Sequence, residues 1–197
     1  MKTPQDFRRE DIKQLFDKIL KEDKTELIPK SISMSETWDS DVTIVSFSFD
    51  LVSGGNKKTY DFVDVQGKGF VDAVFTHCHE KLVQEYDSIK NLSLVDLQVK
   101  PIFSMSRKKT GTDAKTDVIF RLEIRNQGMS EFSCQSRSVV HASLQAMMDA
   151  FQFYVNCDRC FRKLKLFLTN ANERNRGDIS QGILTDMAKL TAVNNYA

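Results

Sequence analysis

Alternating apolar and polar residues predict a strand between Val118 and Ile124. Arg121 and Glu123 fall on one face of this strand, and the other face is formed by Val118, Phe120, Leu122 and Ile124. The preceding residues 111–116 are polar and turn-forming. Gln127-Gly128-Met129 predicts a second turn, into a returning strand that continues the period of two with Phe132, Cys134 and Ser136.

The apolar period then changes to that of a helix. Apolar residues recur at spacings of three and four and form one stripe: Val140, Leu144, Met147, Met148, Phe151 and Val155. A hairpin followed by a helix with a matching apolar face forms a packing unit, because each element buries its apolar side against the other.

The same order of elements is predicted earlier in the chain. Three strands are expected over residues 27–34, 41–52 and 58–66, with Pro29 confining the first to a sheet edge or a strand start. The helix that follows has its own apolar stripe: Val71, Val74, Phe75, Cys78 and Leu82. A strand over residues 92–105 then begins the second unit.

Two strand-strand-strand-helix units predict an α+β fold, with mostly antiparallel sheet and helices packed on one face. Sheet edges and partly covered faces favour a dimer. We divide the chain into an N-terminal helix or linker (1–26), a central domain (27–156) and a partly flexible extension (157–197), where the apolar pattern dissolves. The N-terminal helix is expected to be an appendage rather than part of the core.

Composition narrows the class of protein. The chain has 197 residues and a formal net charge of +1, so bulk charge favours neither nucleic acid nor a membrane as partner. Its apolar runs fall short of the roughly 20 residues that span a bilayer. The first residues lack the apolar core of a secretion signal, and the four cysteines form no disulfide framework. These features predict a cytoplasmic protein with reduced thiols.

Two short motifs suggest metal or redox chemistry. His77 and His79 flank Cys78, but on a helix they point about 200° apart, whereas chelating pairs are spaced by three or four residues. The Cys157-x-x-Cys160 pair lacks a second ligand pair and a thioredoxin-like setting. We therefore expect no metal, no cofactor and no catalytic residues. A small metal or redox protein remains the alternative hypothesis for these motifs.

Gly67-Lys68-Gly69 opens the first predicted helix. Free backbone amides at a helix start, with a lysine beside them, suit an anion. The segment lacks the longer glycine-rich fingerprint of nucleotide-binding folds, and a turn that needs unusual φ angles explains it as well.

Four segments, in order, resemble the C-terminal regulatory (dimerisation) domain of 2-isopropylmalate synthases and citramalate synthases. Residues 67–74 (GKGFVDAV) resemble the family's Gly-x-Gly-Pro-Val-Asp-Ala-Leu segment, and residues 94–99 resemble its next strand. Residues 111–114 match its Gly-Thr-Asp-Ala turn, and residues 137–146 resemble its last helix. The resemblance covers about residues 32–156, and the N-terminal helix is similar, more loosely, to the linker subdomain of these enzymes.

The resemblance implies a non-catalytic allosteric module that forms a homodimer and senses a branched-chain amino acid, leucine or isoleucine. Its partner is a separate catalytic barrel of an acyl-CoA-condensing synthase, a fold of about 250 residues that this chain cannot contain. By residue-to-residue carry-over, the effector pocket involves Lys68, Val71, Asp72, Leu94, Leu97, Pro101, Ala114 and Thr116. Because Lys68 and Phe70 depart from the family pattern, the alternative is a dimerisation scaffold whose pocket has been lost.

Overall fold

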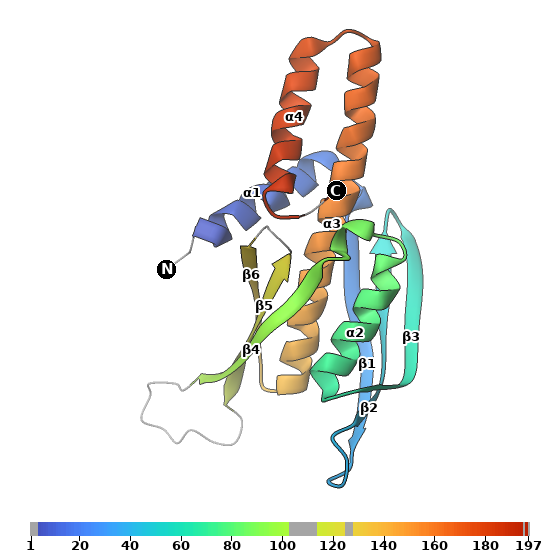
Figure 1. The fold of residues 1–197 in the computed structure, drawn as a ribbon, viewed down its shortest axis with the longest axis vertical. Helices are drawn as coiled ribbons and strands as arrows, with labels where there is room; N and C mark the ends of the chain where they lie inside the picture. Colours follow the sequence, from blue (N-terminus) through green and yellow to red (C-terminus); the bar gives the residue numbers. More distant parts are fainter. Residues whose placement is uncertain (1–3, 103–113, 125–127, 195, 197) are drawn as a thin grey trace.

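The computed structural model describes residues 4–102, 114–124, 128–194 and 196 (Figure 1). Side chains are described from residue 8 onward. The elements in chain order are α1 (Pro4–Ile19), the 3-10 helix η1 (Lys21–Asp23), β1 (Thr25–Glu36), β2 (Thr43–Ser53), β3 (Asn56–Gly67), α2 (Phe70–Val83), the 3-10 helix η2 (Asp87–Ile89), β4 (Leu92–Ile102), β5 (Lys115–Ile124), β6 (Gly128–Ser136), α3 (Val139–Glu173) and α4 (Gly177–Thr191).

The strands form two three-stranded antiparallel sheets, in the orders β1-β2-β3 and β4-β5-β6. Side chains along the middle strands, β2 and β5, point alternately to the two faces of each sheet, so every second side chain faces the helices and is buried. Val45, Phe47 and Phe49 of β2 are at most 2% exposed, and Val118, Phe120 and Leu122 of β5 at most 1%. The prediction of an α+β fold with antiparallel sheet is therefore confirmed.

Two helices cover these sheets. α2 packs on β2 and β3, whereas α3 packs on β5, β6 and β1 (Figure 1). The stripes predicted from the sequence lie in the core, and Phe75 of α2 stacks on Phe151 of α3 with ring centroids 5.2 Å apart. One long helix thus touches both sheets, which joins the two units around a shared core.

The expectation that the N-terminal helix is an appendage is wrong. Its apolar stripe belongs to the core, where Ile12, Leu15, Phe16, Ile19 and Leu20 are at most 8% exposed. Phe16 packs on Phe153 of α3, with ring centroids 5.6 Å apart. Lys18 donates to Asp186 of α4 at 2.8 Å. α1 therefore contacts both α3 and α4.

The helix predicted to lose its pattern after Val155 continues for another eighteen residues, to Glu173. Cys157, Cys160, Leu164 and Ala171 extend the buried stripe, with charged residues between them. α4 then returns beside the second half of α3, and the two form a helical hairpin that projects beyond the sheets (Figure 1). Among the described residues, no helix is both long and apolar enough to cross a membrane.

Candidate functional site

The first group of residues predicted to bind an effector, Lys68, Val71 and Asp72, lies at the start of α2. Gly67 is needed there because a Cβ atom would lie 2.5 Å from the backbone nitrogen of Ala73, and Gly69 has a φ of 107°. The Asp72 carboxylate accepts a hydrogen bond of 2.9 Å from the Lys68 backbone N–H. A structural turn therefore accounts for the two glycines and already uses one of the amides proposed for an anion.

A shallow depression adjoins this turn. It has a volume of about 730 Å³ and lies between Lys68, Gly69 and the loop joining β1 to β2. Trp38 of that loop is fully exposed, at 106% of its reference area. The depression therefore offers one lysine and one exposed indole beside the start of α2.

The second predicted group lies in the other sheet. Leu94, Leu97 and Pro101 are on β4, and Thr116 is paired with Pro101 across the β4–β5 ladder. Ala114 precedes β5 and is half-buried, whereas the rest of the predicted turn, residues 111–113, lies outside the described residues. Leu97 lies opposite Phe120, on the face of the sheet that α3 covers elsewhere.

The two predicted groups belong to different units. The main contacts of α2 are with β3, β2, η2 and α3, whereas the main contact of β4 is with β5. Figure 1 shows the start of α2 and the end of β4 apart, with the first turns of α3 between them in that view. In a single copy of this chain, the eight residues are therefore divided between two units.

The histidine and cysteine motifs have structural roles. His77 Nδ1 lies 2.8 Å from the Ala73 carbonyl, and His79 Nε2 lies 2.8 Å from the Ile89 carbonyl, so each of these nitrogens carries the proton. Burial raises the pKa of the Cys78 and Cys157 thiols well above the usual range, and that of Cys160 to about 12. Such thiols stay protonated, which disfavours nucleophilic chemistry. In the part of the chain that the structure describes, His, Cys, Asp and Glu form no group of three that could hold a metal.

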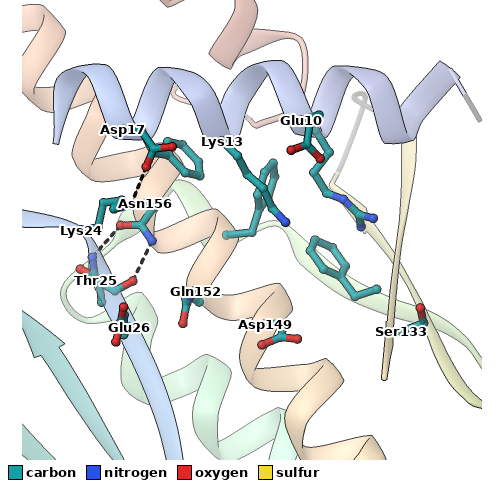
Figure 2. Close-up of a pocket in the computed structure, with 14 residues that line it drawn as sticks. Glu10, Lys13, Asp17, Lys24, Thr25, Glu26, Ser133, Asp149, Gln152 and Asn156 are labelled. Atoms are coloured by element: carbon teal, nitrogen blue, oxygen red, sulfur yellow. Dashed lines mark hydrogen bonds and ion pairs between the residues drawn. The ribbon is translucent and has the colours of Figure 1, made fainter. Parts of the chain in front are cut away.

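A cavity that the sequence did not indicate lies beneath α1. We call it the α1 trough: it has a volume of about 530 Å³ and is bounded by α1, the start of β1, β6 and α3 (Figure 2). Pockets of roughly 300–1,000 Å³ are typical for small ligands. Its apolar floor consists of Phe16, Phe132 and Phe153, each at most 6% exposed.

One wall of the α1 trough is the edge of β1, and α3 completes its hydrogen bonding. The Thr25 N–H donates to Asn156 Oδ1 at 2.8 Å, and Asn156 Nδ2 donates to the Thr25 carbonyl at 2.8 Å. The Leu27 N–H donates to Gln152 Oε1 at 2.9 Å. Pro29, two residues on, has no N–H to satisfy. These two amide side chains therefore replace a neighbouring strand over the first residues of β1.

Charged side chains of both signs form the rim of the α1 trough. Lys24 and Asp17 form an ion pair at 2.5 Å. Arg9 donates to the Glu131 carbonyl of β6 and lies over the Phe132 ring, 4.8 Å from its centroid. The Lys13 side chain extends from α1 into the space between α1 and α3 (Figure 2). The trough thus combines an aromatic floor with accessible cationic and anionic groups.

Two polar residues of α3 are the nearest thing to a local signal for this cavity. Gln152 and Asn156 lie four residues apart on α3, and Asn156 is one of the few polar residues among the buried positions of this helix. Asn156 is only 4% exposed, and a buried amide requires hydrogen-bond partners. The sequence does not reveal that these partners are about 130 residues away, at the start of β1.

Neither the models of known protein families nor the curated proteins match this chain.

Proposed function

We propose that this chain is a non-catalytic regulatory and dimerisation module that senses leucine or isoleucine for a 2-isopropylmalate or citramalate synthase-type enzyme. The repeated order of three strands and a helix supports the proposal. The segments that carry the resemblance occupy corresponding places in it: residues 67–74 run from the end of β3 into α2, and residues 137–146 run from the end of β6 into α3. In both units, two residues separate the third strand from its helix.

The observation that carries dimerisation is the uncovered face of β4. Leu97 and Val99 are 37% and 47% exposed, although Phe120 and Val118, their partners on β5, are fully buried. α3 covers β5 and β6, and α2 belongs to the other sheet. A second copy of the chain is the proposed cover for β4, since homodimers commonly bury the apolar surface that a protomer leaves open.

The proposed sensing is tested by thermal unfolding of the purified chain with leucine, isoleucine or valine. A ligand at about 100 times its Kd stabilises the folded state by about 2.7 kcal/mol, a rise of several degrees in Tm. We expect a rise for one branched-chain amino acid and none for D-leucine, which has the same composition and charge. Equal Tm values in all solutions would remove the sensing role.

A second candidate function is a dimerisation scaffold with no effector. It is favoured by the turn before α2, where the Asp72 carboxylate already occupies the Lys68 amide. The same unfolding series separates the two candidates. A scaffold gives a Tm that rises with protein concentration, as expected for a dimer, but that no amino acid changes.

A further inference from the structure

The α1 trough has polar groups that the fold itself does not use. Asn156 and Gln152 are committed to β1, Lys24 is paired with Asp17, and Arg9 caps the β6 edge. Among the described residues, Lys13 and Glu10 have no hydrogen-bond or ion-pair partner. Both project from α1 over the trough (Figure 2). The cavity therefore presents a free cation and a free anion from the same helix.

The opposite wall of the trough supplies a further carboxylate. Asp149 of α3 accepts a hydrogen bond of 2.8 Å from Gln145 through Oδ1, and it is otherwise exposed. Figure 2 shows Asp149 on α3 facing the space into which Lys13 extends. A cation on α1 and an anion on α3 thus lie on two sides of one cavity, with the phenylalanine floor between the helices.

We propose that the α1 trough is the binding site for an apolar α-amino acid. The ligand carboxylate pairs with Lys13, its ammonium pairs with Asp149, and its side chain packs on Phe16 and Phe153. This inference rests on the proposed function and places the effector under α1 rather than at the start of α2. A phosphate-bearing or other polyanionic ligand is disfavoured, because Glu10, Asp17, Glu26 and Asp149 all line the same cavity.

A ligand in this position links two elements. Lys13 belongs to α1 and Asp149 to α3, so a bound amino acid adds one contact to each helix and holds α1 against α3. Ligand binding thereby stabilises the docked position of α1 by an amount set by the difference in affinity between the docked and undocked states. In the proposed function, α1 is similar to the linker subdomain that precedes the regulatory domain, so this contact would have a regulatory consequence.

The test is isothermal titration of leucine, isoleucine and valine into the full chain and into Lys13→Glu. Reversing this charge should weaken binding of the preferred amino acid at least about tenfold, because a charge-assisted hydrogen bond is lost and a repulsion replaces it. The matched control is Lys165→Glu, the same change on an exposed position of α3, which should bind as the unchanged chain does. Circular dichroism verifies that both variants are folded.

Hydrogen exchange with and without the amino acid locates the site independently of any substitution. Slower exchange in α1 and at the start of β1 supports the trough. Protection confined to the start of α2, together with loss of binding in Asp72→Asn but not in Lys13→Glu, overturns the trough and leaves amino-acid sensing intact. An unchanged chain that binds none of the three amino acids overturns both the trough and the sensing function.

Discussion

The two units of this protein have the same order of elements, but α3 covers only the first strand of the first unit, and only over its first residues. In the first unit, α3 reaches the edge of β1, where Thr25 and Leu27 are at most 2% exposed. The second half of β1 is open, with Met34 48% exposed, and in the second unit β4 exposes Leu97 and Val99 by more than a third of their areas. The difference arises because α3, with 35 residues, packs on both sheets, whereas α2, with 14, packs mainly on one.

The helix starts differ in the same way. α3 begins with Ser138 as its N-cap, and the Ser138 side chain accepts from the His141 N–H at 3.2 Å. α2 begins after Gly69, which has no side chain to cap it, and Asp72 bonds back to Lys68 instead. The repeated topology thus permits local specialisation: one unit has a tight glycine turn, and the other has an uncovered strand.

The substitutions with the largest expected effect on the free energy of unfolding test whether the two units unfold together. Phe49→Ala in β2 and Phe120→Ala in β5 remove equivalent, fully buried side chains from the two middle strands. Each should lower the free energy of unfolding by about 3–5 kcal/mol in a single transition, because α3 joins both sheets to one core. Urea unfolding followed by circular dichroism measures this effect. Phe167→Ala, at a position that is 42% exposed, is the control and should cost less than about 1 kcal/mol. Two separate transitions, each affected by one variant, would show that the units are independent.

The next effect concerns the covered edge of β1. Asn156→Ala leaves the buried N–H and carbonyl of Thr25 without their partner, at a cost of about 2–4 kcal/mol. The control, Asn170→Ala, changes the same residue type on an exposed position of α3 and should stay within about 0.5 kcal/mol. Denaturant unfolding measures both. A loss below about 1 kcal/mol in Asn156→Ala would mean that water replaces the amide at this edge.

The smallest effect on folding is expected at the exposed strand. Val99→Glu on β4 should leave the stability of one copy nearly unchanged, because Val99 is 47% exposed, but should convert the proposed dimer to a monomer. Val63→Glu on β3 is the matched control, since it adds the same charge at a valine that is 74% exposed on the edge of the other sheet. Sedimentation velocity reports the mass of each. A monomeric unchanged chain, or a dimeric Val99→Glu variant, would exclude β4 as the interface.

Local pattern was enough to predict most elements of the fold. The alternation between Val118 and Ile124 gave β5, and Pro29 correctly indicated that β1 is an edge strand. The apolar stripe from Val140 to Val155 gave the first half of α3. The second half was missed because Arg159, Arg162, Lys163 and Lys165 obscure a buried stripe that nevertheless continues through Cys160 and Leu164. A side chain with a long apolar stem and a charged end fits beside such a stripe, so charge alone did not end the helix.

The sequence by itself determined the α+β class, the repeated order of elements and the glycine turn before α2. These properties depend on the period of the apolar residues, on φ angles and on turn-forming residues, all of which are determined by a few neighbouring positions. Tertiary structure alone decided that the predicted effector residues divide between two units, that α1 joins the core and that Asn156 completes the edge of β1. Such pairings link residues more than 100 positions apart, and no local period specifies them, because they depend on how complete elements pack against one another.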